Sequence, residues 1–345
     1  MRGLILAAGL AVLAAPALAQ GVAGNIVAGG EGSTDTAMAR DIAGVAAECG
    51  VALGVQASDG SVANMAAVRD RPRTQLGIVQ SDVLDYFRAF QADDPALART
   101  ARGIRIAFPL SDGAVHVLAR TGIADLAGLD GRRVATGPEG SGTRVTADLV
   151  MDLAGVAPGE RVALAPQAAV AALLAGEIDA MVYVGGVPAA ELGDPRLVGA
   201  AHLLPLQAPA LTATYEAGEI PAGAYPFVAS PVPVVKVRSL LVTFDYLPGR
   251  NSYQAASCRL VADVGHLLLT RLGRLQAEGH PAWKTVDPTD LPAGWQVSDC
   301  VLQGLDPAYP FVCRRPDGSE VSEGAAGGEG ANGLFVSRVC ARIGC

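Results

Sequence analysis

Residues 133–154 read RVATGPEGSGTRVTADLVMDLA, and this stretch gives the clearest prediction of the fold class. A short strand, Arg133–Thr136, runs into a glycine-rich turn, and a helix is expected from Val145 to Ala154. The same order occurs about 110 residues earlier, where residues 25–48 read NIVAGGEGSTDTAMARDIAGVAAE. Glu-Gly-Ser stands in the first turn of both stretches. Two such units at so long a period predict two similar lobes, not a solenoid.

Strands alternate with helices on both sides of this repeat, which predicts an α/β protein with a parallel sheet covered on both faces. The other expected elements are the strands Asn25–Ala28, Val51–Val55, Leu76–Val79, Val162–Leu164 and Ala180–Val184, and the helices Ala37–Glu48, Val62–Arg69, Ala168–Ala175 and Arg259–Leu275.

Two stretches are expected to connect the lobes, Ile104–Leu118 on the way out and Tyr225–Phe244 on the return. Two crossings between α/β lobes make a hinge with a cleft beside it. The predicted division is residues 20–110 and 231–296 for lobe 1 and residues 111–230 for lobe 2. Ligands of open α/β sheets bind beyond the carboxyl ends of the strands, so both glycine-rich turns are expected to face the cleft.

The two turns supply the first candidate binding residues. Glycine lets the backbone approach a ligand, and serine or threonine hydroxyls add donors. A helix that starts at such a turn offers unpaired N–H groups and a partial positive charge, which suit a carboxylate or a phosphate. A plain capped helix start, with Thr34 or Asp35 as the cap of the first helix, is the alternative. The candidates are Gly30, Ser33, Ser141, Gly142 and Thr143.

Further candidates lie at strand and helix ends. Arg144 follows the second turn and is placed either to pair with a carboxylate or to lie on the surface. Gln80 and Ser81, with Asp82 next to them, end the third strand, where their polar groups would reach the cleft. Tyr183 lies at the matching place in the second half and is either a cleft wall with a hydroxyl or a core residue.

Catalytic and cofactor motifs are missing from these turns. Neither turn has the Gly-Lys-Ser/Thr of a P-loop or the full Gly-x-Gly-x-x-Gly spacing. Ser141 is not in a Gly-x-Ser-x-Gly nucleophile elbow. The four histidines are scattered and no Cys-x-x-Cys occurs, which argues against a metal site. We therefore expect a binding protein that is not an enzyme and uses no cofactor.

Charge and composition narrow the partners. The chain has 345 residues, which predicts two domains, and a formal net charge of -8. So acidic a protein is unsuited to nucleic acid or to an anionic membrane surface. A cleft lined by backbone amides still binds an anion against that overall field.

The N-terminus predicts export. Arg2 precedes an apolar run from Leu4 to Leu13, and Ala17-Leu18-Ala19 provides a small-residue cleavage site before Gln20. The run is too short to span a bilayer, so residues 1–19 are expected to be a cleaved signal peptide and the mature chain to be periplasmic, without membrane insertion.

The chain has six cysteines, which are Cys49, Cys258, Cys300, Cys313, Cys340 and Cys345. An even number in an oxidising compartment favours disulfides. Sequence leaves the pairing open, and Cys300 with Cys313 across a short hairpin is the favoured pair. The turn-rich residues 297–345, with four of the six cysteines, are expected to form a Cys-rich C-terminal appendage stapled by disulfides.

The chain resembles the TAXI class of solute-binding subunits of TRAP transporters. The matching pieces are Gly29-Gly30-Glu31-Gly32-Ser33, Ser61-Val62-Ala63-Asn64, Leu76 to Asp82, Thr136 to Arg144 and Ala180 to Val187. The match covers roughly residues 22–245 and leaves out the Cys-rich segment.

The resemblance implies a two-lobed type II periplasmic-binding-protein fold that closes on a small carboxylate, such as a dicarboxylate or an acidic amino acid. It also implies delivery to TRAP-type membrane permease subunits. The binding positions that it implies are Gly30, Ser33, Ser61, Gln80, Ser81, Ser141, Gly142, Thr143 and Tyr183. Two other functions stay open from the residues, a phosphate- or phosphonate-binding ABC receptor and a ligand-sensing input for a membrane sensor kinase.

Overall fold

The structure is a computed structural model, and it describes residues 23–306, 308–315 and 317–321. The expected signal peptide and two of the cysteines, Cys340 and Cys345, lie outside the described residues. Lobe 1 begins with seven elements, which are β1 (Ala23–Val27), α1 (Thr34–Glu48), β2 (Ala52–Gln56), α2 (Ser61–Asp70), β3 (Thr74–Gln80), α3 (Ser81–Phe90) and α4 (Pro95–Ala101).

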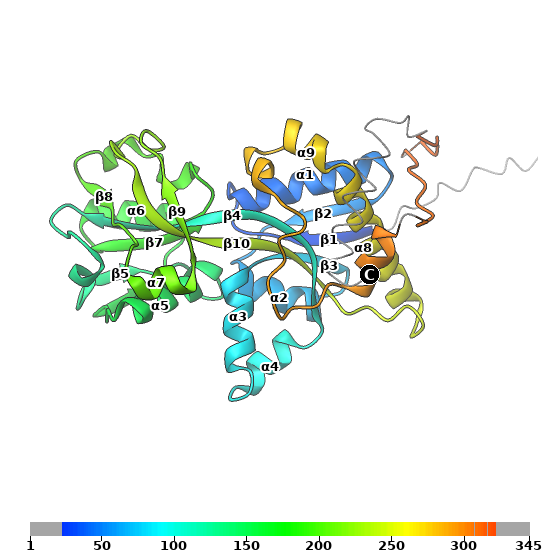
Figure 1. Cartoon of the computed structure of the whole chain (residues 1–345), viewed down its shortest axis with the longest axis horizontal. Coiled ribbons are helices and arrows are strands. Elements are labelled where there is room, and N and C mark those ends of the chain that lie inside the picture. Colours follow the sequence, from blue (N-terminus) through cyan, green and yellow to red (C-terminus); the bar gives the residue numbers. More distant parts are fainter. Residues whose placement is uncertain (1–22, 307, 316, 322–345) are drawn as a thin grey trace, which may run out of the picture.

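Two long strands, β4 (Ile104–Arg120) and β10 (Val232–Phe244), run side by side through both lobes (Figure 1). They are the two connections expected from sequence, and each is one continuous strand. Lobe 2 lies between them in the chain. Its elements are η1 (Leu126–Leu129), β5 (Arg133–Ala135), α5 (Gly142–Ala154), β6 (Glu160–Val162), α6 (Pro166–Ala175), β7 (Ala180–Gly185), η2 (Ala190–Leu192), η3 (Pro195–Leu197), β8 (Ala201–Leu203), α7 (Pro209–Thr214) and β9 (Glu216–Ile220).

After β10 the chain completes lobe 1 with α8 (Ser252–Thr270), α9 (Leu272–Glu278), η4 (Pro281–Thr285) and α10 (Asp299–Leu305). Sequence predicted a single helix from Arg259 to Leu275. The structure has two helices that meet at Arg271, and the first starts earlier because Asn251 caps it by accepting a hydrogen bond from the Gln254 amide at 2.9 Å.

The strands of the described residues belong to one sheet, in the order β2-β1-β3-β10-β4-β7-β5-β6, with β8 added on β4 and β9 on β10. Within each lobe the repeat strands are parallel, β1 with β2 and β3, and β5 with β6 and β7. The long strands join the two parallel groups in antiparallel pairings. The result is a two-lobed α/β fold in which β4 and β10 form the hinge.

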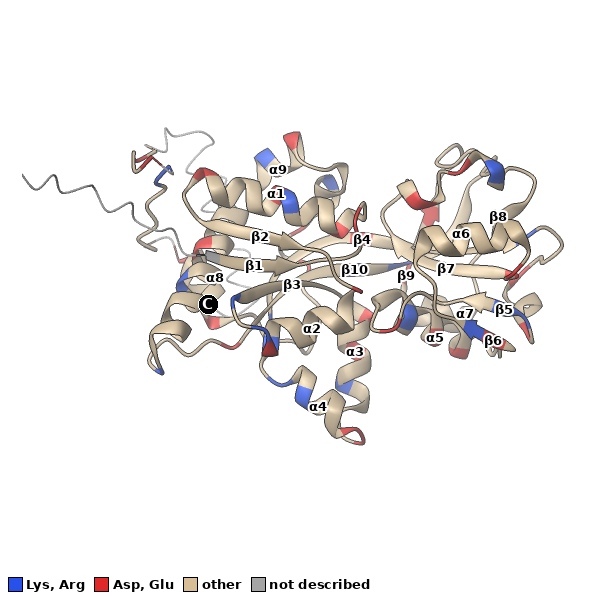
Figure 2. Ribbon diagram, turned by 180° about the vertical axis from the view of Figure 1, so that it is seen from behind, with Lys and Arg blue, Asp and Glu red and all other residues tan. Residues whose placement is uncertain are grey.

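Helices cover both faces of this sheet. In lobe 1, α1, α8 and α9 lie over one face and α2, α3 and α4 over the other, and in lobe 2, α6 lies opposite α5 and α7 (Figures 1 and 2). Lobe 1 has a core on each face, around Ile42 and Leu267 on one and Met65 and Phe87 on the other. Lobe 2 has its own core, around Val150 and Met181.

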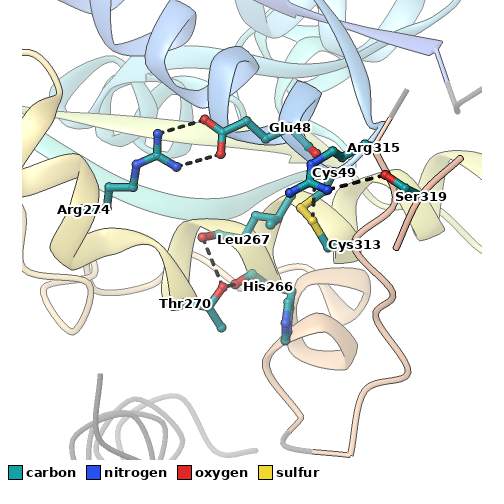
Figure 3. Close-up of a disulfide and its surroundings, with 9 residues drawn as sticks. All are labelled: Glu48, Cys49, His266, Leu267, Thr270, Arg274, Cys313, Arg315 and Ser319. Carbon is teal, nitrogen blue, oxygen red and sulfur yellow. Dashed lines mark hydrogen bonds and ion pairs between the residues drawn. A yellow bond between two sulfur atoms is a disulfide. The ribbon is translucent and has the colours of Figure 1, made fainter. Parts of the chain in front are cut away.

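The cysteine pairing expected from sequence is wrong. Cys49 pairs with Cys313, and Cys258 pairs with Cys300. Helix α10 packs along α8, which places Cys300 beside Cys258, and the chain beyond it returns to the end of α1, where Cys49 lies (Figure 3). The described part of the C-terminal segment is therefore linked to lobe 1 by disulfides, and no disulfide joins two described cysteines of that segment.

Among the described residues no helix is both long enough and apolar enough to cross a membrane.

Candidate functional site

The two lobes touch at the second glycine-rich turn. The Val62 and Ala63 amides, at the start of α2 in lobe 1, donate to the Gly140 carbonyl of lobe 2 at 3.0 and 3.2 Å. The first amides of a helix have no partner within the helix, so the Gly140 carbonyl caps α2 from the opposite lobe. The lobes are closed on each other at this point.

Three of the predicted residues meet there. The Ser61 hydroxyl accepts a hydrogen bond from the backbone N–H of Gln80 at 3.0 Å. A Cβ added to Gly142 would lie 2.5 Å from Ser61 Oγ and 2.6 Å from Gln80 Cδ. A larger residue at this position would force the Gln80 and Ser61 side chains to shift, so glycine allows the close approach of α5 to lobe 1.

The serines of the two Glu-Gly-Ser turns cap their helices. Ser33 Oγ accepts from the Thr36 amide at 3.2 Å, and Ser141 Oγ accepts from the Arg144 amide at 3.1 Å. The expectation that Thr34 or Asp35 would cap the first helix is wrong, because α1 starts at Thr34. The repeat seen in the sequence is thus a repeat of the N-cap.

A small cavity of about 20 Å³ lies between the lobes beside the hinge, which is the space for about one water molecule. The start of α1, the end of β3, the end of β7 and both hinge strands contribute to it. Its lining residues are Ser33, Thr34, Asp35, Gln80, Ser111, Asp112, Gly113, Tyr183, Val184, Gly185, Gly186 and Ser239. Of the predicted residues it brings together Ser33, Gln80 and Tyr183. In this closed arrangement the cavity has no room for a molecule larger than water.

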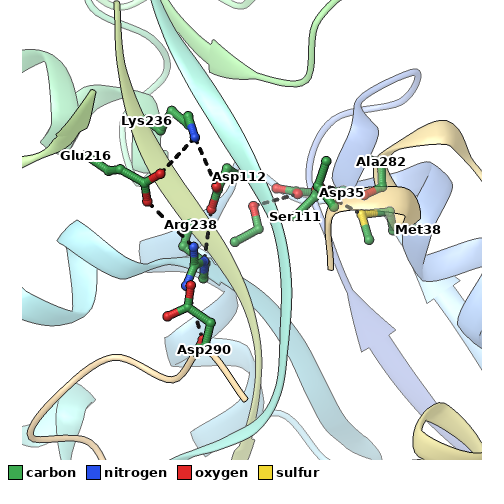
Figure 4. A network of polar contacts seen from close by, with 11 residues as sticks. Asp35, Met38, Ser111, Asp112, Glu216, Lys236, Arg238, Ala282 and Asp290 are labelled. Atoms are coloured by element: carbon green, nitrogen blue, oxygen red, sulfur yellow. Dashed lines mark hydrogen bonds and ion pairs between the residues drawn. The ribbon is translucent and has the colours of Figure 1, made fainter. Parts of the chain in front are cut away.

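Asp35 is the acidic group at the α1 end of this cavity. Its carboxylate accepts a hydrogen bond from Ser239 Oγ of β10 at 2.9 Å, and it lies near Ser111 of β4 (Figure 4). Burial raises the pKa of Asp35, and the Ser239 hydroxyl opposes that rise only in part. Sequence reasoning considered Asp35 only as a helix cap, because its partner Ser239 lies on β10, 204 residues further along the chain.

Tyr183 forms the wall at the β7 end. Its side chain is buried, and its hydroxyl donates to Glu191 at 3.3 Å. Burial is the main cause that raises its pKa, with the charges of Glu191 and Asp35 acting in the same direction. The phenol therefore remains a neutral donor.

Asp82 connects the two lobes through its side chain. This residue is 7% exposed, and its Oδ2 accepts from Thr146 Oγ1 at 2.6 Å and from the Tyr215 hydroxyl at 3.2 Å, both in lobe 2. Burial raises the pKa of Asp82 to about 6, against the effect of the two hydroxyls. Thr146 and Tyr215 were not predicted from sequence, because no local pattern indicates that they bond to Asp82, which lies 64 and 133 residues away.

A second hollow of about 510 Å³ lies between α3, the start of β9 and the hinge strands. Apart from Asp82, its charged residues form ion pairs with one another. Arg238 contacts Asp112 at 2.9 Å and also pairs with Asp290, while Lys236 pairs with Glu216 at 2.9 Å (Figure 4). The predicted residue Ser81 lines this hollow and not the small cavity.

The remaining predicted residues lie outside the cavity. The guanidinium of Arg144 pairs with Asp148 one turn along α5, at 3.1 Å, and does not line the cavity. Thr143 packs against the turn, where a Cβ on Gly137 would lie 3.1 Å from it. The Gly30 carbonyl accepts from Thr36 Oγ1 at 3.0 Å and so stabilises the first turn.

The described residues include no group of three or more His, Cys, Asp or Glu side chains arranged to hold a metal ion.

A model of the NMT1-like family matches residues 26–256. Among solved structures, the chain is similar to the alkanesulfonate-binding protein SsuA from Xanthomonas axonopodis pv. citri bound to MOPS, with a TM-score of 0.41 and 15% identity over 78% of this chain and 86% of that one. It is similar to DctP7, a Bordetella pertussis extracytoplasmic solute receptor binding pyroglutamic acid, with a TM-score of 0.42 and 16% identity over 76% and 80%. It is also similar to MatC from Rhodopseudomonas palustris with bound malate, with a TM-score of 0.45 and 21% identity over 73% and 88%.

Proposed function

Because the chain belongs to the NMT1-like family and has the two-lobed α/β fold of periplasmic solute-binding proteins, we propose that it is a periplasmic receptor for a small organic anion. The observation that carries this proposal is the meeting of the two lobes. Turns at the carboxyl ends of strands in both lobes surround one cavity, and both crossing strands pass beside it. Separation and closure of the lobes about those strands capture the solute.

The helix starts at the cleft supply the groups for an anion. Helix α1 begins at the cavity and α5 begins at the neighbouring contact between the lobes, and the first amides of each have no partner within the helix. Such amides bind a carboxylate without a cationic side chain. This mode of binding suits the cleft because Arg144, the cation expected from sequence, pairs with Asp148 instead.

The partner in this proposal is a TRAP-type permease of the TAXI class, in keeping with the motifs at residues 29–33 and 136–144. The solute is a dicarboxylate or an acidic amino acid. The receptor is exported by its N-terminal segment, releases the solute to the permease and performs no chemistry on it.

Thermal unfolding tests the proposal. The mature chain from Gln20, purified with its disulfides formed, is mixed with dicarboxylates, acidic amino acids, phosphate and phosphonates. A solute at 100 times its dissociation constant stabilises the native state by about 2.7 kcal/mol, a shift of about 4 °C for a chain of this length. A shift with an organic acid supports the proposal. A shift with phosphate or phosphonates alone, or no shift with ligand-free protein, contradicts it.

A further inference from the structure

Asp82 is a carboxyl group that both lobes enclose. It lies in the first turn of α3 in lobe 1, and it is 7% exposed. The Thr146 and Tyr215 hydroxyls of lobe 2 both donate to its Oδ2, at 2.6 and 3.2 Å. The other oxygen, Oδ1, is buried and has no hydrogen-bond partner among the described residues. A proton on Oδ1 therefore leaves both interlobe hydrogen bonds in place.

The cations that surround Asp82 in the described part of the chain are engaged elsewhere. On its own helix, Arg88 pairs with Asp85 at 3.2 Å, and on α5, Arg144 pairs with Asp148 at 3.1 Å. The hinge strands, β9 and the loop before α10 contribute the other charged residues of the hollow that Asp82 lines, which are Asp112, Glu216, Lys236, Arg238 and Asp290. The lysine and the arginine of this set form ion pairs with its three acids (Figure 4). An ionised Asp82 is thus met by hydroxyl groups and not by a cation.

The surroundings of Asp82 differ between closed and separated lobes. Because Thr146 and Tyr215 belong to lobe 2, they leave Asp82 when the lobes separate, and water reaches the carboxyl group. In water, at the start of a helix, the ionised form is the stable one. In the closed arrangement, burial without a cation favours the neutral form and raises the pKa of Asp82 to about 6, against the effect of the two hydroxyls. The closed arrangement therefore binds a proton more tightly than the separated one.

We propose that the lobes take up a proton at Asp82 when they close on the solute, so that the receptor binds its solute more tightly as the pH falls. Since the proton is held more tightly in the closed arrangement, solute affinity is highest below pH 6 and decreases as the pH rises through 6. By the same linkage, solute binding draws a proton from the medium. This inference rests on the proposed function, because it requires that the lobes close on a solute.

Calorimetric titrations with L-glutamate and L-aspartate from pH 5 to pH 8 test the inference, because the charge of either amino acid changes little in this range. The wild type should bind about tenfold more tightly at pH 5 than at pH 7. Asp82→Asn is neutral at every pH, keeps an acceptor for Thr146 and should bind with an affinity that does not change with pH. Asp93→Asn, at an exposed carboxylate between α3 and α4, is the control and should keep the pH dependence of the wild type.

Thr146→Val distinguishes a proton site from a merely structural bond. The Thr146 hydroxyl favours the ionised form of Asp82, so its loss should weaken binding and also move the midpoint of the pH dependence to higher pH. Titration at pH 6 in two buffers of different ionisation enthalpy counts the protons. The wild type should take up about half a proton for each solute bound, and Asp82→Asn should take up none.

The outcomes separate this inference from the proposed function. Equal affinity of the wild type at pH 5 and pH 7 overturns the inference and leaves the receptor function standing. An unaltered pH dependence in Asp82→Asn overturns it as well, because the proton then binds elsewhere. If Asp82→Asn does not fold, the midpoint in Thr146→Val decides.

If neither amino acid binds, solution X-ray scattering of the ligand-free chain decides. A radius of gyration that is smaller at pH 5 than at pH 7 in the wild type, and independent of pH in Asp82→Asn, keeps the proton-linked closure and contradicts a receptor for acidic amino acids. A radius of gyration of the wild type that does not change with pH overturns the inference.

Discussion

Thr146 of lobe 2 donates a hydrogen bond to Asp82 of lobe 1, with 2.6 Å between Oγ1 and Oδ2. Tyr215 donates to the same carboxylate oxygen at 3.2 Å, and Thr146 also reaches Gln80 Oε1 at 3.3 Å. These bonds exist only while α3 and α5 are together, so they are bonds of the closed state. Residues that make them should control solute affinity even though they do not touch the solute.

Thr146→Val tests this relationship. Valine has nearly the same shape and lacks the hydroxyl, so the buried Asp82 carboxylate loses its shorter hydrogen bond. We expect closure to become less favourable by about 1–3 kcal/mol, which is a loss of roughly 5- to 150-fold in solute affinity by calorimetry. Thr212→Val, at an exposed threonine of α7, is the control and should bind as the wild type does. An unchanged affinity in Thr146→Val would rule out the interlobe bond as a determinant of closure.

Asp82 should make stability depend on pH. Burial raises the pKa of this group from its ordinary value of 3.8 to about 6, so between these pH values the folded state binds a proton that the unfolded state has lost. The contribution of Asp82 to stability is therefore present below pH 3.8 and is lost as pH rises through 6. Asp82→Asn removes this dependence.

Urea unfolding of the wild type and Asp82→Asn from pH 4 to pH 7 measures the effect. The stability of the variant relative to the wild type should increase with pH by up to about 3 kcal/mol and level off above pH 6. The difference between the two proteins isolates Asp82 from carboxyls such as Asp179, whose pKa is lowered by Arg133. A difference that is constant with pH contradicts the raised pKa.

Gly142→Ala should prevent closure without unfolding either lobe. The new methyl group would overlap the side-chain amide of Gln80 and lie 2.5 Å from Ser61 Oγ. Both residues belong to the opposite lobe. Alanine itself suits a helix, so the strain falls on the interface. We expect at least a tenfold loss of solute affinity with little change in thermal stability. Gly44→Ala, at a glycine of α1 with open space around it, is the matched control. Wild-type affinity in Gly142→Ala would show that this approach is not required for binding.

The two disulfides should be found by peptide mapping of the unreduced protein as Cys49–Cys313 and Cys258–Cys300. Replacing Cys258 and Cys300 by serine removes a link that closes a loop of 42 residues, and it should cost about 2–4 kcal/mol of unfolding free energy. A Cys300–Cys313 link in the map would contradict this arrangement.

Local sequence patterns predicted the elements of the fold because each depends on near neighbours. The strand-turn-helix repeat, the two crossings and the helix α5 were expected close to where they occur. Long-range pairing was not predictable in this way. Cys313 pairs with a cysteine 264 residues away, and only the packed structure places the two together. The C-terminal cysteines were therefore assigned a local partner, which was wrong.

The candidate site was predicted in the same uneven way. The first turn and the ends of β3 and β7 line the cavity, since carboxyl ends of strands meet at one edge of a sheet, whereas the second turn lies at the lobe contact outside it. A side chain that has a partner nearby does not need to reach the cavity. Arg144 is an example, because it pairs with Asp148 one turn along α5. Asp35 was recognised only as part of a helix start, because its neighbour Ser239 lies 204 residues further along the chain.

Solution X-ray scattering with and without solute tests whether the lobes close on a captured solute. Calorimetry first establishes saturation with the acid or amino acid that binds most tightly. We expect that the radius of gyration of the wild type decreases on saturation and that Gly142→Ala does not become equally compact. A radius of gyration that stays the same in the saturated wild type would contradict lobe closure as the means of capture.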